Sequence, residues 1–479
     1  MRTADQFLDG LRDDREVYYR GERVADVVDH PELGIAARHA ALDYAFAEKP
    51  EHRELAVTDG HSTYYDLPRD GSDLRRRSLL IERATAYAAT LVILVKEIGT
   101  DALFALHRVT HGSEGSERVE AYHRHCRAGD LALAVAQTDV KGDRSKGPGA
   151  QADPDLYVRV VDRGPDGLVV RGAKVHTSCT PNVDELVVIP TRALADGEED
   201  WAVAFAVPVA TPGLKLYCSD FLHADADDWT RPISSRHKMI ETLTVFDDVF
   251  VPWERVFLDR DTRGAGRLAL TFVEHHRFTA VSYKLPLVDL LVGLALALAE
   301  ANGIQRASHV RDKLVALVGY AETVRGLTHL AADRFRVDEP TGIAFPDPMT
   351  TNIAKWTFAR DYGAAVERVI DIAGGLLATG PSGADWRNDE IRPVLEKYLV
   401  GALPAAERMA LVNLASDLLA REYAGYQSVL ALHAEGSLEA EKLMIARSYA
   451  SAPAVAYARK LAGLTGSGGG EDKDDRGDS

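Results

Sequence analysis

Cysteine is scarce in this sequence. The 479 residues contain three cysteines, Cys126, Cys179 and Cys218, and no pair has CxxC spacing. This count excludes a disulfide framework and a four-cysteine metal site. We therefore expect three reduced, mostly buried thiols in a cytoplasmic protein.

Positive charge and long apolar runs are also limited. The formal net charge is -17, and so acidic a surface repels nucleic acid and anionic membrane. Residues 1–10 lack the basic start and apolar run of a signal peptide. The apolar stretch Leu285–Ala299 is interrupted by Asp289, which is typical of a buried helix and not of a membrane span.

Three zones of different periodicity predict the domain organisation. Residues 1–130, including the segment 78–99, show helical spacing of apolar residues. Residues 131–262 have short alternating runs punctuated by Gly and Pro, which predicts a β-barrel or sandwich. Residues 263–464 predict a bundle of long helices, and residues 465–479 predict a disordered tail.

Several segments, in one order along the chain, resemble the family of 4-hydroxyphenylacetate 3-monooxygenase (large component) and 4-hydroxybutyryl-CoA dehydratase. They are residues 11–24, Thr138–Ser145, Val170–Ser178, Ser234–Arg236, Val245–Phe257, Gly374–Gly375 and Arg392–Tyr398. The resemblance implies an α+β, mostly α, acyl-CoA dehydrogenase-like fold, with an N-terminal helical domain, a middle β-barrel and a C-terminal bundle. The segments at 141–145, 172–174 and 395–398 look closer to the dehydratase branch.

The same resemblance implies FAD contacts. They fall at Lys141, Gly142, Asp143, Arg144, Ser178, Gly374, Gly375, Gly436 and Ser437. Backbone N–H groups and Arg144 suit a pyrophosphate, and the 374–375 pair would approach the flavin of a neighbouring subunit in a homotetramer. On residue type alone, 141–144 is typical of a solvated charged turn, and the glycine pair is equally typical of a helix end.

The dehydratase branch holds a four-iron cluster with three cysteines and a histidine. The resemblance places Ile93, Glu97 and Tyr283 at the cysteine positions and His276 at the histidine position. Iron in such a cluster requires soft thiolate ligands. We therefore predict no iron–sulfur cluster and no other metal.

Other polar residues of that site persist. They are His276, Lys284, Glu241 and Glu435, and Tyr283, at a lost cysteine position, adds a phenol to the set. His276, Tyr283 and Lys284 share one face of a predicted helix, and the set suits acid–base chemistry. The alternative is structural, with a core histidine, a Lys284–Glu241 salt bridge and a packed tyrosine.

The preferred function is a two-component monooxygenase that uses FADH2 from a separate flavin reductase to hydroxylate an electron-rich aromatic small molecule. The chain has no GxGxxG fingerprint at a strand–helix junction, so we expect no nicotinamide site. The position of the phenol-contacting histidine in the hydroxylase branch holds Val135, which disfavours 4-hydroxyphenylacetate itself. The runner-up is a redox-neutral acyl-CoA dehydratase or isomerase without the cluster, and a third hypothesis is an inactive scaffold.

Overall fold

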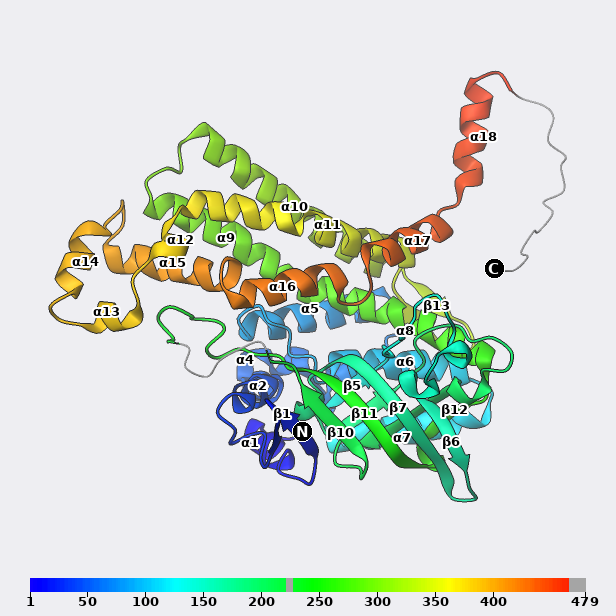
Figure 1. The fold of residues 1–479 in the computed structure, drawn as a ribbon. Helices are drawn as coiled ribbons and strands as arrows, with labels where there is room; N and C mark the ends of the chain where they lie inside the picture. Colours follow the sequence, from blue (N-terminus) through cyan, green and yellow to red (C-terminus); the bar gives the residue numbers. More distant parts are fainter. Residues whose placement is uncertain (221–226, 465–479) are drawn as a thin grey trace.

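The computed structural model describes residues 1–220 and 227–464. The protein is 55% helical and 15% strand. Figure 1 shows a long helical bundle above two sheets, with α5, α6 and α8 between them and α1 and α2 beside the sheets. The predicted tail, 465–479, lies outside the described residues.

The N-terminal part is mostly helical but also contains strands. Its helices are α1 (Ala4–Gly10), α2 (Leu33–Ala40), α3 (Leu42–Glu48), α4 (Pro50–Ala56), α5 (Gly71–Tyr87), α6 (Glu97–Thr110) and α7 (Glu114–Gly129). The strands β1 (Glu16–Tyr19) and β2 (Glu22–Val24) leave this part and join a sheet, while β3 (Val57–Thr58) and β4 (His61–Ser62) form a small hairpin.

The helix predicted across residues 78–99 is interrupted. Between α5 and α6 the chain runs through an irregular, buried segment in which Ala89, Thr90 and Leu94 have positive φ. Such backbone is strained for residues with a side chain. Apolar spacing continues through this segment because it is buried, so the sequence pattern does not reveal the break.

The middle part forms two sheets, not the β-barrel that the resemblance implied. The strands are β5 (Leu133–Ala136), β6 (Arg159–Arg163), β7 (Gly167–Ser178), β8 (Glu185–Val188), β9 (Val203–Pro208), β10 (Leu214–Cys218), β11 (Glu241–Pro252) and β12 (Val256–Asp259). Their orders are β2-β1-β10-β11-β7-β6 and β12-β9-β8-β5. Each sheet ends in unpaired edge strands among the described residues, so neither closes; alternation within short strands is the same in a barrel and in paired sheets.

The C-terminal part is the predicted bundle. Its helices are α8 (Thr262–Tyr283), α9 (Leu285–Ala301), α10 (Ser308–Asp333), α11 (Pro348–Ala373), α12 (Leu376–Thr379), α13 (Gly383–Arg387), α14 (Arg392–Tyr398), α15 (Ala405–Leu419), α16 (Glu422–His433), α17 (Leu438–Ser448) and α18 (Ser451–Leu461), with the hairpin β13 (Arg336–Asp338) and β14 (Ile343–Phe345) between α10 and α11. Within the described residues, one stretch, 262–301, is apolar and long enough to span a membrane, but 67% of its most apolar window is buried in the protein. That burial is typical of a core helix, as the sequence predicts for Leu285–Ala299.

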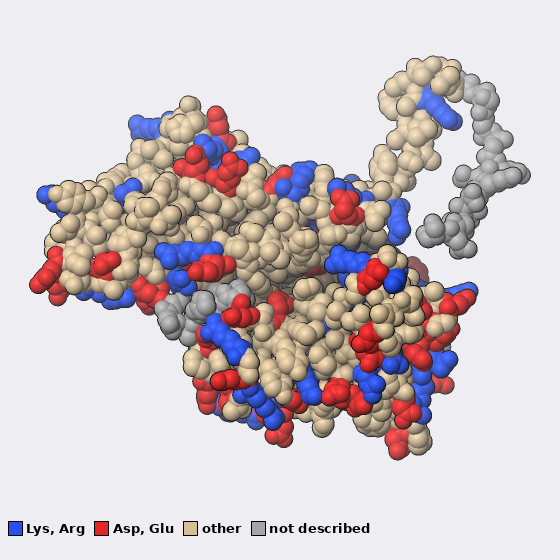
Figure 2. All heavy atoms as spheres, viewed as in Figure 1, with Lys and Arg blue, Asp and Glu red and all other residues tan. Residues whose placement is uncertain are grey.

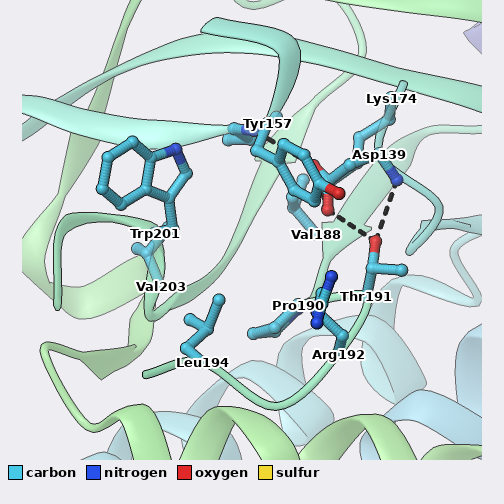
Figure 3. A pocket seen from close by; sticks show the side chains of 11 residues that line it. Asp139, Tyr157, Lys174, Val188, Pro190, Thr191, Arg192, Leu194, Trp201 and Val203 are labelled. Atoms are coloured by element: carbon cyan, nitrogen blue, oxygen red, sulfur yellow. Dashed lines mark hydrogen bonds and ion pairs between the residues drawn. The ribbon is translucent and has the colours of Figure 1, made fainter. Parts of the chain in front are cut away.

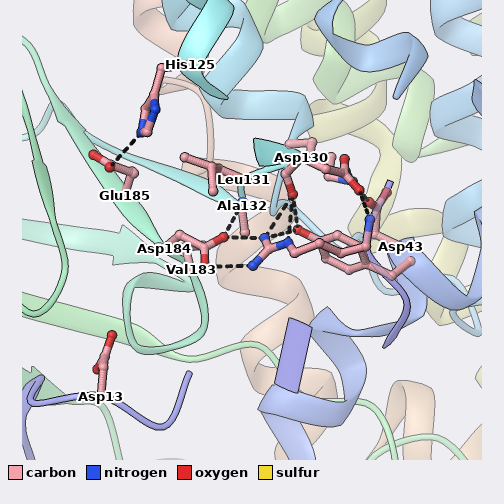
Figure 4. Close-up of polar contacts among 12 residues, drawn as sticks. Asp13, Asp43, His125, Asp130, Leu131, Ala132, Val183, Asp184 and Glu185 are labelled. Atoms are coloured by element: carbon pink, nitrogen blue, oxygen red, sulfur yellow. Dashed lines mark hydrogen bonds and ion pairs between the residues drawn. The ribbon is translucent and has the colours of Figure 1, made fainter. Parts of the chain in front are cut away.

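Buried ion pairs attach the N-terminal part to the four-stranded sheet. Lys96 is fully buried, with its ammonium 2.8 Å from Asp43 and 2.7 Å from Asp130. Arg2 donates to Asp184, just before β8, at 3.0 Å, and to the Asp130 carbonyl at 2.8 Å (Figure 4). Because a buried charge is costly unless it is paired, these contacts fix the start of α6 relative to β5.

Candidate active site

Glu241 begins β11 and lies opposite Ser178, the last residue of β7. The Ser178 hydroxyl donates to the Glu241 carboxylate at 2.8 Å, and Tyr426 of α16 donates to its other oxygen at 3.2 Å. Burial raises the pKa of Glu241 to about 7, although both hydrogen bonds oppose the shift. A carboxyl group with such a pKa can accept or release a proton near neutral pH.

Glu435 is the acceptor for two neighbouring side chains of the bundle. Tyr283 donates to one carboxylate oxygen, and the Lys284 ammonium lies 2.9 Å from the other. Burial raises the pKa of Glu435 well above its ordinary value and lowers that of Lys284 well below its own. Both shifts favour the neutral forms, so burial narrows the gap between the two pKa values. The salt bridge of the structural alternative joins Lys284 to Glu435 and not to Glu241.

The loop between α16 and α17 is held in an unusual conformation. Glu435 has a φ of 60° and Gly436 a φ of 119°. A Cβ on Gly436 would lie 2.7 Å from the guanidinium of Arg277, which donates to the Glu435 carbonyl at 3.0 Å. Only glycine allows this close approach without displacing the arginine. Ser437 caps α17 by accepting from Ala440 N–H at 3.4 Å.

His276 faces a buried carboxylate that the sequence analysis missed. Its Nδ1 is 3.6 Å from Oδ2 of Asp101 on α6. The other oxygen, Oδ1, accepts from Arg77 at 2.8 Å and from Thr279 at 3.0 Å, so the carboxylate is fixed in place. Burial lowers the pKa of His276 while Asp101 opposes that shift. The signal in the sequence was an acidic residue within an otherwise apolar helix face, in the segment Gly99–Leu103.

The five predicted acid–base residues lie in one electrostatically coupled region. The charge of Lys284 adds to the burial that lowers the pKa of His276, and the charge of Glu241 adds to the burial that raises the pKa of Glu435. Lys355 and Glu441, which the sequence analysis also missed, lie 3.6 Å apart beside Glu435. Among the described residues, no group of three or more His, Cys, Asp and Glu side chains is placed to hold a metal ion.

The predicted flavin loop follows β5 and carries positive charge. Lys141 and Gly142 both have positive φ, at 71° and 52°. Burial lowers the pKa of Lys141, and the charges of Arg144 and Arg192 add to the shift, so these cations lie close together. Burial also lowers the pKa of His176 on β7, and the charges of Lys141, Arg144 and His433 add to that shift. The carboxylate of Asp143 accepts from Ser145 at 2.7 Å inside the loop.

A polar group behind this loop anchors it to the sheets. The Asp139 carboxylate is 2.9 Å from the Lys174 ammonium and accepts from Thr191 and from the Val158 N–H at 3.0 Å (Figure 3). The Lys174 ammonium also donates to the Ile189 carbonyl at 3.0 Å. Because these groups are buried and paired, the loop starts from a fixed position.

Gly374 and Gly375 lie apart from the other predicted site residues. They end α11, and a Cβ on either would meet nothing within 4 Å. Lys355, beside Glu435, is 19 residues earlier on the same helix, which corresponds to roughly 28 Å. The predicted flavin contacts of the glycine pair, of Ser178 and of the 436–437 pair stay predictions.

Alignment with solved structures defines the class of this fold. A glutaryl-coenzyme A dehydrogenase structure aligns with a TM-score of 0.51 at 16% identity, over 92% of this chain and 89% of that chain, which shows an acyl-CoA dehydrogenase-like fold. A structure of the oxygenase component of 4-hydroxyphenylacetate 3-monooxygenase complexed with FAD and 4-hydroxyphenylacetate aligns at a TM-score of 0.91 with 28% identity, over 97% and 99% of the two chains.

Sequence comparison then identifies the family. The models for the N- and C-terminal parts of 4-hydroxyphenylacetate 3-hydroxylase match residues 3–258 and 265–463, so this chain belongs to that family. It is 32% identical to the 4-hydroxyphenylacetate 3-monooxygenase oxygenase component of Thermus thermophilus, over 87% of this chain and 88% of the relative. It is 30% identical to 4-hydroxybutyryl-CoA dehydratase/vinylacetyl-CoA-Delta-isomerase of Clostridium aminobutyricum, over 97% and 100%. The predicted family is confirmed, and the chain is a flavoprotein oxidoreductase of that family.

Replacing Asp101 tests its influence on His276. Asp101→Asn removes the charge that favours protonated His276, so the acid limb of the pH–rate profile should move to lower pH. By analogy with other His–carboxylate pairs, we expect turnover to fall at least about tenfold. The control Asp289→Asn also removes a carboxylate paired with an arginine, 2.6 Å from Arg325, but it faces no histidine. An unchanged profile in a folded variant would assign Asp101 to packing alone.

The raised pKa of Glu241 predicts a pH-dependent effect on stability. In the unfolded chain the group ionises near its ordinary value of 4.5, whereas in the folded protein it ionises at about 7. Its contribution to stability is therefore fully present below pH 4.5 and is lost as pH rises to about 7, a loss of about 3 kcal/mol.

Glu241→Gln should remove this loss, so the variant gains stability relative to wild type across that pH window. Thermal unfolding of the FAD-free proteins at a series of pH values measures the difference. Glu254→Gln, at an exposed position, serves as the control. Parallel curves for wild type and Glu241→Gln would contradict the assignment.

Proposed function

We propose that this protein is the oxygenase component of a two-component monooxygenase that hydroxylates an electron-rich aromatic small molecule. A separate flavin reductase would provide FADH2. The observation that carries the proposal is the buried group of His276, Glu241, Lys284 and Glu435 beside a cationic loop, in a chain that belongs to the 4-hydroxyphenylacetate 3-hydroxylase family.

The cationic loop fits the diphosphate of FAD. Lys141, Arg144 and Arg192 approach one another, and none of the three has a carboxylate partner within salt-bridge distance among the described residues. Their mutual repulsion would be relieved by a bound polyanion. Figure 2 shows the surface hollowed between the sheets and the bundle. Bound reduced FAD would supply the electrons for the reaction with O2, in which one oxygen atom enters the substrate as a hydroxyl group and the other is reduced to water.

His276 is the proposed base for the substrate. Because its Nδ1 faces Asp101, its Nε2 is available to take the proton of a phenolic hydroxyl. The lowered pKa of His276 keeps the ring neutral at working pH. Glu435 and Lys284 would hold a second exchangeable proton. Phe272 stacks on His276 and the ring of Phe358 faces the Lys284 ammonium, so both rings limit the access of water to these side chains.

The redox-neutral alternative is supported by a different observation. The relative from Clostridium aminobutyricum, whose name combines a dehydratase and an isomerase, covers nearly the whole chain. Moving a double bond within an acyl thioester requires an acid and a base but no oxidant, and the Glu435–Lys284 pair could serve that purpose. Dehydration itself has less support, because Ile93, Glu97 and Tyr283 replace the thiolates that hold the metal cluster.

We also propose a homotetramer located in the cytoplasm. In Figure 1, α18 projects from the body of the molecule, whereas α17 packs against α11 of the bundle. Large apolar side chains on these two helices and between them are exposed, among them Leu443, Tyr449, Tyr457 and Leu461 at 56–71%. Contiguous exposed apolar surface marks an interaction site, and a second copy of the chain would bury it.

Oxygenation can be tested with protein loaded anaerobically with FADH2. Mixing with ¹⁸O2 and a panel of phenols should give a product that carries one labelled oxygen atom, as detected by mass spectrometry. A parallel incubation of an unsaturated acyl thioester without O2 tests the isomerase. A labelled product supports the monooxygenase function. Isomerisation of the thioester without any labelled product would contradict that function and support the redox-neutral isomerase instead.

The loop variant Lys141→Gln/Arg144→Gln should weaken FAD binding by about tenfold or more, because each lost charge-assisted hydrogen bond contributes about 1.5–3 kcal/mol. Lys146→Gln is the matched control. It lies in the same loop but pairs with Asp143 at 3.4 Å. Equal FAD affinity in all three proteins would contradict the assigned loop.

The assembly has its own test. With a chain mass of 52.2 kDa, light scattering should give a mass close to four chains. A chain ending after Ser448 should give a smaller species, because it lacks α18 and its exposed apolar side chains. A tetramer that survives this truncation would show that another surface joins the subunits.

A further inference from the structure

A second cleft lies beside the C-terminal end of α6, where His107 lines it. It has a volume of about 720 Å³ and is bordered by α6, α7, the segment after β4 and the β13–β14 hairpin. Clefts that bind small molecules usually have volumes of about 300–1,000 Å³. None of its lining residues belongs to the flavin loop or to the acid–base group.

The walls of this cleft are tied together. Arg69 donates to the carbonyls of Thr341 and Gly342, at 3.2 and 3.3 Å, in the turn of the hairpin. The Ala344 N–H donates to the Pro68 carbonyl at 2.8 Å. The hairpin is therefore attached to the segment before α5, and the cleft keeps its shape without a ligand.

The cleft carries a small excess of positive charge, with four arginines and three carboxylates among its lining residues. Arg69, Arg76 and Arg127 line it, and none has a carboxylate within salt-bridge distance among the described residues. The three carboxylates of the lining each have another partner: Asp66 contacts His61 at 2.6 Å, Asp73 accepts from the Arg69 backbone N–H at 2.8 Å, and Glu120 lies 3.9 Å from Arg124. Guanidinium groups bind phosphate in a bidentate manner.

Two histidines at the floor of the cleft have fixed tautomers. His123 Nε2 lies 2.8 Å from the Tyr65 carbonyl, so it carries the hydrogen. Burial lowers the pKa of both His123 and His107, so both rings are neutral. His123 Nδ1 then accepts from His107 Nε2 at 2.9 Å, which leaves His107 Nδ1 as an acceptor. A ligand hydroxyl is the group that this nitrogen would bind.

We propose that this cleft binds a small phosphate ester that also carries a hydroxyl group. The arginines would hold the phosphate dianion, and His107 Nδ1 would accept from the hydroxyl. The size of the cleft allows a sugar phosphate or a larger ester of the same kind. This site is independent of the proposed oxygenation, because it shares no residue with it.

Calorimetric titration of the FAD-saturated protein tests the proposal, since FAD then occupies its own phosphate site. We expect ribose 5-phosphate to bind with a dissociation constant of about 10 μM to 1 mM, with ribose showing no binding and inorganic phosphate binding more weakly. Arg127→Gln should weaken ribose 5-phosphate binding by about tenfold or more. The exposed Arg311→Gln, on α10, is the matched control.

A second variant separates the two halves of the ligand. His107→Leu should weaken binding of ribose 5-phosphate but not of inorganic phosphate. The proposal is overturned if no probe binds when its concentration is about ten times the weakest expected dissociation constant. It is also overturned if Arg127→Gln and Arg311→Gln bind ribose 5-phosphate equally well. Inorganic phosphate binding as tightly as the ester would overturn the role of the hydroxyl.

Discussion

The buried guanidinium of Arg77 fixes the geometry on which the catalytic residues depend. It extends from α5 and donates to the Tyr64 and Glu97 carbonyls, at 3.2 and 2.8 Å, and to Asp101 at 2.8 Å. Asp101 in turn accepts from Thr279 on α8 and faces His276 on the same helix. An unpaired charge at this depth would cost several kcal/mol, so α5, α6 and α8 can pack together only in this register.

The catalytic groups are also defined by the lack of water around them. Burial is the largest cause of the shifts in the pKa values of Glu241, Glu435, Lys284 and His276. Each shift favours the neutral form, so groups that would be ions in water can hold or take a proton. Perturbed groups of this kind gather at active sites, where the protein accepts lower stability in exchange for chemistry.

The sequence predicted the order of helices, strands and helices, because long periodic segments determine it locally. Residue-by-residue resemblance located His276, Lys284 and Glu435, which lie up to 159 positions apart and which no local pattern could join. The break at 88–96 escaped prediction because buried apolar residues look alike in a helix and in an irregular segment. The expected barrel was wrong, and the role of Asp101 was missed, for a related reason: strand pairing and the partners of a carboxylate depend on residues far apart in the sequence.

The pairing of β1 with β10 has a consequence for biosynthesis. Val17 lies beside Leu216 in a parallel register, so the chain between them must be made before the six-stranded sheet can form. At about 5–20 residues per second, β1 waits roughly 10–40 s for its partner. During that interval an edge strand with buried-type residues is exposed to the cell, and chaperones or early packing of α1 and α3 would have to protect it. The nascent chain is therefore most vulnerable to aggregation early in its synthesis, long before the catalytic helices exist.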